Sequence, residues 1–161
     1  MKNIILGIDP GYGRTGWGVI EKTDQDVKYL AAGCIETDPK SQFGDRLAVV
    51  YRQVCKLIKK FQPQALSVET LYFNKNAKTV ILASQARGVI VLAGVENHLP
   101  VYDYTPLQVK QALVGYGRGE KQQVQSMLLY HLKITSLPKQ DDACDALAVA
   151  LSHAYTNQQL K

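Results

Sequence analysis

The chain has 161 residues, 46% of them hydrophobic and 20% charged, which is the composition of an ordinary globular protein with a sizeable core. Its 19 basic and 14 acidic residues give a net charge of +5, an excess that suits a polyanionic partner without proving one. Cys34, Cys55 and Cys144 have neither zinc-site spacing nor the even number of a disulfide framework, which indicates a reducing compartment.

The N-terminal stretch MKNIILGID has an apolar run too short for a signal peptide, and no segment approaches the length that spans a membrane. The sequence contains no repeat, no low-complexity tract and no linker that would divide it. We therefore expect one cytoplasmic domain over residues 1–161, with no membrane partner.

The first half of the chain predicts four strands and one helix. The run NIILGID predicts a buried strand over 3–9, and the runs 17–22 and 27–37 around a polar turn predict two more strands of an antiparallel meander. Apolar residues at helical spacing predict an amphipathic helix over 44–61. The short apolar run 65–69 predicts a further buried strand that, like the first, ends in an acid.

The next segment combines a polar loop with an unusually apolar helix. Residues 71–76 predict the loop, with Asn76 as the helix cap, and residues 77–97 predict the helix. A helix that is apolar nearly all round is buried in a core or lies at a subunit interface. We therefore regard 77–97 as the candidate interface of a homodimer, or else as a central helix that covers the sheet within one subunit.

The last third of the chain predicts one strand followed by helices. After a strand over 101–105, Thr105, Pro106 and Gln108 form the pattern of a capping box with proline at the first helical position. A glycine-rich turn over 115–119 follows. Two further helices are predicted over 120–133 and about 142–157.

The order of elements predicts the fold class. A hairpin meander followed by alternating helices and strands indicates an α/β protein with a mixed five-stranded sheet flanked by helices. Parallel crossovers in such a sheet are right-handed, which restricts the topology.

Acidic residues stand at the ends of these elements. Asp9 closes the first strand and Glu69 the fourth, and ligands of open α/β sheets gather at the carboxyl ends of strands. The stretch QDDACDALAVAL adds Asp141, Asp142 and Asp145 at the start of the last helix. Helix capping accounts for the first two, but a charge at Asp145, a turn further in, is costly unless it is paired or bound to metal.

Four carboxylates in one cluster would repel each other unless cations lay between them. Oxygen-only ligands select Mg²⁺ or Mn²⁺, and two such ions can drive phosphodiester cleavage. Helical spacing allows either Asp141 or Asp142 to join Asp145 on the sheet edge. The residues alone leave that choice open.

Basic and aromatic residues surround these acids in the sequence. The candidate phosphate contacts are Lys75, Lys78, Lys110, Arg118 and Lys121, although a solvated basic face is the commoner fate of any single lysine. Tyr72 and Phe73 lie in a predicted exposed loop, where a ring can stack on an unpaired base. A ring packed back on the core is the alternative for one of them.

The chain resembles the RuvC family of crossover-junction endodeoxyribonucleases over nearly its whole length. The resemblance implies a ribonuclease-H-like fold and a homodimer that cleaves four-way (Holliday) DNA junctions with divalent metal, in recombination and repair. It also implies RuvA and RuvB as partners in branch migration. The stretches that carry it are, in order, ILGIDPGYGRTGWGVI, SVETLYFNKNAKT, QARGVIVLA, YTPLQVKQALVGYGRGEKQQVQ and QDDACDALAVALSHA.

Residue by residue, the resemblance implies catalytic acids that hold two Mg²⁺ ions, with Mn²⁺ able to substitute. These acids are Asp9, Glu69, Asp142 and Asp145. The family pattern has its acid three positions before the last one, which favours Asp142 and leaves Asp141 as a cap. The resemblance also places Lys110 and Lys121 near the cut strand and Tyr72 on a junction base, with Phe73 as the alternative ring.

Three rival hypotheses are compatible with parts of the sequence. The first is a ribonuclease-H-like nuclease that acts on RNA or a hybrid. The second is a phosphate-loop ATPase, which the stretch GIDPGYGRTG superficially suits, although that architecture needs a second lobe. The third is a junction-binding protein without catalysis.

Overall fold

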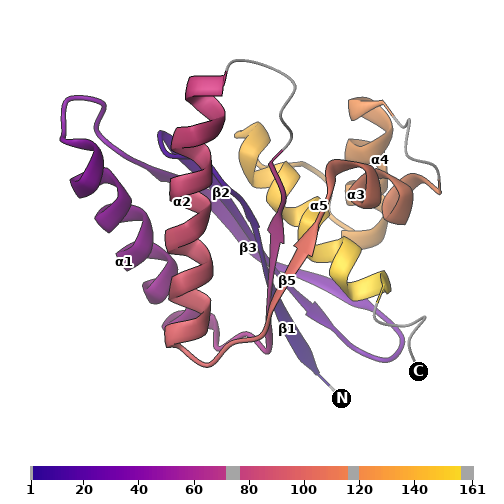
Figure 1. The fold of residues 1–161 in the computed structure, drawn as a ribbon. Helices are drawn as coiled ribbons and strands as arrows, with labels where there is room; N and C mark the ends of the chain where they lie inside the picture. Colours follow the sequence, from indigo (N-terminus) through magenta and orange to yellow (C-terminus); the bar gives the residue numbers. More distant parts are fainter. Residues whose placement is uncertain (1, 72–76, 116–119, 157–161) are drawn as a thin grey trace.

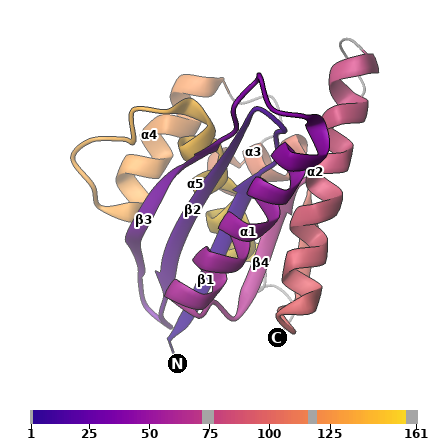
Figure 2. The ribbon, with the colours of Figure 1, turned by 90° about the vertical axis from the view of Figure 1, so that its left-hand side faces the viewer.

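The computed structural model describes residues 2–71, 77–115 and 120–156. A five-stranded sheet in the order β3-β2-β1-β4-β5 forms the middle of three layers, with helices on both of its faces (Figures 1 and 2). The elements are β1 (Asn3–Asp9), β2 (Arg14–Lys22), β3 (Val27–Glu36), α1 (Phe43–Phe61), β4 (Ala65–Glu69), α2 (Ala77–Glu96), β5 (Val101–Tyr104), α3 (Pro106–Val114), α4 (Lys121–Leu132) and α5 (Asp141–Thr156).

The sheet is mixed, which confirms the predicted fold class. β1, β2 and β3 are antiparallel neighbours, whereas β4 runs parallel to β1 and to β5. β2 begins at Arg14, three residues before the predicted start, because its ladder with β3 continues as far as the pair Arg14↔Glu36. The remaining ends of strands and helices lie within one or two residues of the prediction.

Alternation along the strands creates a separate core on each face of the sheet. Leu6 and Ile8 of β1 point into the core under α1 and α2, whereas Ile5 belongs to the core under α3, α4 and α5. Every second residue of β1, counted from Ile5, therefore faces α5. Asp9 is the last of these, so its position in the strand directs it toward α5.

Glycines allow α5 to lie directly on the sheet. A Cβ atom at Gly7 would overlap the carbonyl oxygen of Ala146, and a Cβ atom at Gly16 would overlap that of Asp142. At Gly18 it would lie 2.9 Å from the backbone nitrogen of Leu147. Any side chain at these positions would lift the helix, so the glycines of β1 and β2 hold its N-terminal half near the edge where β1 ends.

α2 packs on the opposite face beside α1 (Figure 2), with one side buried and the other exposed. Its inner residues include Ala86 and Ile90, both fully buried, while Ile81, Leu92 and Val95 are 50–58% exposed. The segment Lys78–Glu96 is long and apolar enough to span a membrane by length and composition, and only 28% of it is buried. The expectation that no segment approaches that length is therefore wrong.

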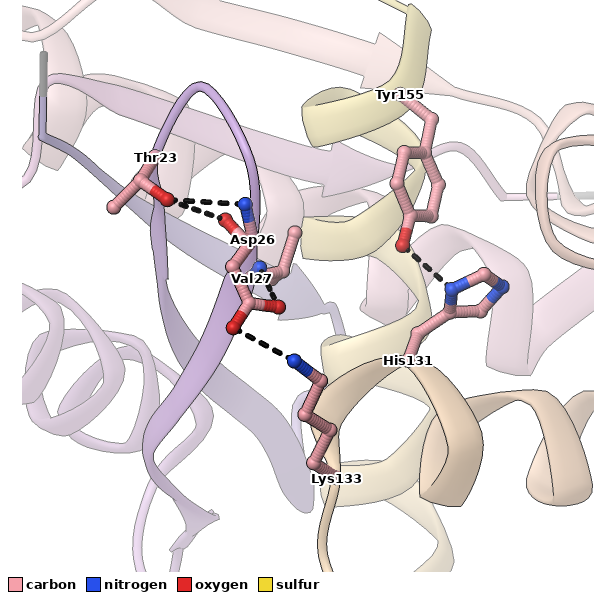
Figure 3. Close-up of polar contacts among 6 residues, drawn as sticks. All are labelled: Thr23, Asp26, Val27, His131, Lys133 and Tyr155. Atoms are coloured by element: carbon pink, nitrogen blue, oxygen red, sulfur yellow. Dashed lines mark hydrogen bonds and ion pairs between the residues drawn. The ribbon is translucent and has the colours of Figure 1, made fainter.

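Polar contacts fasten α4 to the far end of the sheet (Figure 3). Lys133, just after α4, forms an ion pair of 2.9 Å with Asp26 in the β2–β3 turn, where Thr23 accepts a hydrogen bond from the Asp26 backbone nitrogen. The Tyr155 hydroxyl of α5 lies 2.7 Å from Nδ1 of His131 on α4. These contacts hold the C-terminal end of α4 against the β2–β3 turn and α5. The helix begins, at its N-terminal end, with Lys121.

The predicted capping box starts α3. Oγ1 of Thr105 accepts a hydrogen bond of 3.2 Å from the Gln108 backbone nitrogen, and the Gln108 side chain accepts one of 2.8 Å from the Thr105 backbone nitrogen. Pro106 occupies the start of the helix, and Gly115 ends it with φ of 86°. Because this helix begins directly after β5, it carries Lys110 to the same edge of the sheet as Glu69.

Candidate active site

Asp9 and Glu69 lie side by side at the carboxyl ends of two parallel strands. The β1–β4 register pairs Ile8 with Val68, so the next step along both strands brings the two acids together. A side-chain hydrogen bond joins their carboxyl groups. The parallel pairing that the sequence suggested is confirmed, and it places both acids on the α5 side of the sheet.

The first turns of α5 bring two more carboxylates to the same edge. Asp145 is half-buried, and the side chain of Asp142 is 34% exposed. The charges of both act on Asp9. Residues from the beginning, middle and end of the chain thus form one acidic cluster, which we define as Asp9, Glu69, Asp142 and Asp145.

Three acids of the cluster, Asp9, Glu69 and Asp145, have raised pKa values. Burial and, to a lesser extent, the negative charges of Glu69 and the two α5 aspartates together raise the pKa of Asp9 to about 8. Burial also raises the pKa of Glu69, to about 7. The contact between the two carboxyl groups raises the pKa of Asp9 and lowers that of Glu69.

The donor set of the acidic cluster fits a hard divalent cation. All of its ligand atoms are carboxylate oxygens, which select Mg²⁺ or Mn²⁺ over softer metals. Repulsion among these clustered acids is the kind that a bound cation relieves. Among the residues that the structure describes, no three His, Cys, Asp or Glu side chains form a ready-made metal site. The carboxylates therefore share an edge of the sheet without already forming a closed ligand shell.

Two lysines stand beside the acidic cluster around a pocket of about 230 Å³. Glu69 and Asp145 line this pocket together with Lys110 of α3 and Lys121 of α4. The charge of Lys110 lowers the pKa of Glu69, and that of Lys121 lowers the pKa of Asp145, which burial raises overall. Carboxylates with flanking lysines can bind a cation and a phosphate at once.

Asp141, for which a capping role was predicted, forms an ion pair with Lys121. It is the first residue of α5, and its carboxylate lies 2.7 Å from Nζ of Lys121. The pair is exposed on both sides, so it guides Lys121 toward the start of α5 without contributing much stability.

Arg14 is a contact of the acidic cluster that the sequence analysis missed. Its Nη1 atom lies 3.4 Å from Oδ2 of Asp142, and its Nε atom lies 3.2 Å from Oε1 of Glu36. The sequence did contain an indication of this contact. Arg14 lies two residues before Gly16, so both residues are on the face of β2 on which α5 rests. The ion pair itself joins residues 128 positions apart, and no local pattern reveals it.

The remaining predicted contacts fall into two groups. Tyr72, Phe73, Lys75 and Arg118, as well as the predicted cap Asn76, lie outside the described residues. Lys78 is exposed in the first turn of α2. The catalytic, metal-binding and DNA-binding roles of all the candidate residues stay predictions, whereas the convergence of the four acids is a feature of the structure.

Comparison with known proteins gives consistent matches along nearly the whole chain. A sequence model of the family described as "Crossover junction endodeoxyribonuclease RuvC" matches residues 5–153. A protein of that name from Finegoldia magna is 48% identical over 151 residues, which is 94% of this chain and 92% of the relative. One from Ruminiclostridium cellulolyticum is 47% identical over 155 residues, 96% of this chain and 93% of the relative.

Solved structures agree with the sequence comparison. The structure described as "T. thermophilus RuvC in complex with Holliday junction substrate" has a TM-score of 0.92 and 32% identity, and the match covers 98% of this chain and 96% of that one. The yeast mitochondrial Holliday junction resolvase Ydc2 has a TM-score of 0.73 at 14% identity, covering 97% of this chain and 79% of that one, a likeness of fold alone.

Proposed function

Because the chain belongs to the RuvC family of crossover junction endodeoxyribonucleases, it is a metal-dependent nuclease that resolves Holliday junctions, and we propose that the acidic cluster is its catalytic centre. The cluster holds two Mg²⁺ ions, for which Mn²⁺ substitutes. The product is a pair of symmetric nicks with 5′-phosphate and 3′-hydroxyl ends.

The observation that carries this proposal is the convergence of Asp9, Glu69, Asp142 and Asp145 at one edge of the sheet. Asp9 and Glu69 are brought together at the ends of parallel strands, although burial and neighbouring carboxylates raise the pKa of both. Such an arrangement is costly for the fold and is typical of a functional site. Oxygen ligands from β1, β4 and α5 then provide what a pair of hard cations requires.

Each residue of the site has a distinct task in this reaction. When bound, the metal pair activates the attacking water and stabilises charge on the leaving oxygen. The carboxylates of the acidic cluster would hold these cations through their oxygen atoms. Lys110 and Lys121, on the rim of the pocket, pair with phosphate oxygens of the cut strand and neutralise the charge that builds up there.

Incubation of the purified protein with a synthetic four-way junction, in Mg²⁺ or in EDTA, tests the proposal. We expect cleavage only with Mg²⁺, and binding without cleavage for Asp9→Asn. Asp45→Asn is the matched control, since Asp45 is an exposed acid in the first turn of α1. Duplex and RNA–DNA hybrid substrates in the same assay test the rival substrates. Equal cleavage of hybrid and junction would contradict junction selectivity.

We propose that two copies pair through the exposed side of α2. Ile81, Leu92 and Val95 lie on that side, where a monomer would leave an apolar stripe in water. Within the described part of the chain, and apart from its own helix backbone, a Cβ atom at Gly88 would have no heavy atom within 4 Å, which leaves room for a second helix to approach. A two-fold dimer supplies one acidic cluster for each of two opposed strands of the junction. Light scattering that finds only monomer at micromolar concentration would contradict this pairing.

Family membership alone leads us to propose RuvA and RuvB as partners and the cytoplasm as the location. Adding the two proteins to the junction assay tests the partnership. A change in the rate or position of cleavage is the expected result. Fractionation of cells that express the protein tests the location.

A further inference from the structure

Arg14 joins two acids that belong to different elements. Its Nη1 atom contacts Oδ2 of Asp142 on α5, and its Nε atom contacts Oε1 of Glu36 at the end of β3. The guanidinium group is planar and rigid, so its two contacts have a fixed spacing. The start of α5 is thereby tied to the β2–β3 ladder through one side chain.

The contact with Arg14 uses one oxygen of the Asp142 carboxylate and leaves the other available to a ligand. Arg14 binds Oδ2, and within the described part of the chain Oδ1 accepts no hydrogen bond. Asp142 lies in the first turn of α5, and its negative charge acts on Asp9. A side chain that is 34% exposed and unsupported would turn freely among its rotamers.

We propose that Arg14 is a positioning residue that holds the Asp142 carboxylate in the orientation that binds metal, with Glu36 holding Arg14 in place. This inference rests on the proposed metal site at the acidic cluster. Arg14 occupies one carboxylate oxygen and directs the other toward the cation. Partners of metal-binding carboxylates act in this way, and their loss commonly weakens metal binding about 10- to 100-fold.

A purely electrostatic role makes the opposite prediction. If Arg14 acted only through its positive charge, it would compete with the cation, and its removal would tighten metal binding. Lysine at this position keeps the charge but cannot make both contacts of the guanidinium group. The two roles are therefore distinguished by comparing a variant that keeps the charge with one that loses it.

The test is Mn²⁺ binding to the DNA-free protein, followed by the electron paramagnetic resonance of free Mn²⁺. We expect Arg14→Lys and Arg14→Gln each to weaken binding about tenfold, the lower end of the range because the ion pair is half-exposed. Arg52→Gln is the matched control, because Arg52 is exposed on α1, on the opposite face of the sheet, and should leave binding unchanged. Urea unfolding of each variant shows that the fold is kept.

A second set of variants shows whether Arg14 acts through Asp142. In an Asp142→Asn background, Arg14→Gln should weaken Mn²⁺ binding no further, and Glu36→Gln alone should weaken it by a smaller factor than Arg14→Gln. Unchanged or tighter Mn²⁺ binding by both Arg14 variants would overturn the inference. Wild-type protein that binds no Mn²⁺ would instead overturn the proposed metal site, so the two failures are distinguishable.

Discussion

Gly16 is the position at which contact between the sheet and α5 is closest to the acidic cluster. A Cβ atom there overlaps the backbone carbonyl of Asp142 and lies 3.0 Å from the Cβ atom of the same residue. Carbon atoms pack at roughly 3.5–4.0 Å, so Gly16→Ala must push the start of α5 away from β2 by about 1 Å. We expect this to lower the cleavage rate about 100-fold, because Asp142 and Asp145 move with the helix. Overpacking should lower the free energy of unfolding by about 1–3 kcal/mol.

Single-turnover cleavage of a four-way junction at saturating protein measures the first effect, and urea unfolding measures the second. Gly44→Ala is the matched control, since a Cβ atom at Gly44, in the first turn of α1, has no heavy atom within 4 Å. Gly44→Ala should cleave the junction at the wild-type rate and gain up to about 1 kcal/mol of stability from helix propensity. Wild-type cleavage and stability in Gly16→Ala would refute the reasoning that α5 must rest on β2.

Three further predictions concern other parts of the molecule. Raised pKa values at Asp9 and Glu69 mean that the folded protein binds protons more tightly than the unfolded chain. The metal-free protein should therefore lose stability progressively as pH rises from about 4 to about 8, by up to about 1 kcal/mol per pH unit for each group. Thermal unfolding in EDTA at pH 5.5 and pH 9 checks this. Leu92→Glu should convert a dimer to monomers in light scattering, because it places a charge on the apolar side of α2. Thr105→Ala should lower the free energy of urea unfolding by about 1 kcal/mol through loss of the capping box.

Each of these predictions has an internal control. Mg²⁺ at pH 9 should restore the thermal stability, because cations replace protons in the acidic cluster, and an equal effect of Mg²⁺ at pH 5.5 would argue against that site. Lys56→Glu introduces the same charge on an exposed face of α1 and should leave the dimer intact. Thr105→Ser retains the capping oxygen and should unfold like the wild type.

The sequence predicts those parts of the fold that depend on local pattern. β1 and β4 are continuous apolar runs that end in acids, and the capping box of α3 is a four-residue signal, so all three were found with their bounds nearly correct. The mixed sheet followed from the order of elements. The convergence of Asp9 and Glu69 required one further assumption, that β1 and β4 are parallel neighbours, which the sheet confirms.

Features that depend on contacts between distant segments were missed. The first residues of β2, from Arg14 to Gly16, carry no strand pattern and are extended because β3 pairs with them. The ion pair of Arg14 with Asp142 and that of Lys121 with Asp141 form only when α5 reaches the sheet. The sequence of α2 likewise could not show which side would be exposed, since its twelve hydrophobic residues are spread around the helix.

The placement of α5 also affects the protein during its synthesis. The last helix supplies two of the four carboxylates, and its backbone lies against β1 and β2, which are translated first. A nascent chain still lacking that helix has an uncovered sheet face and an incomplete acidic cluster. Ribosome-bound fragments should therefore be unable to cut chromosomal DNA, and nuclease activity should arise only when the C-terminal part of the chain docks on the N-terminal part.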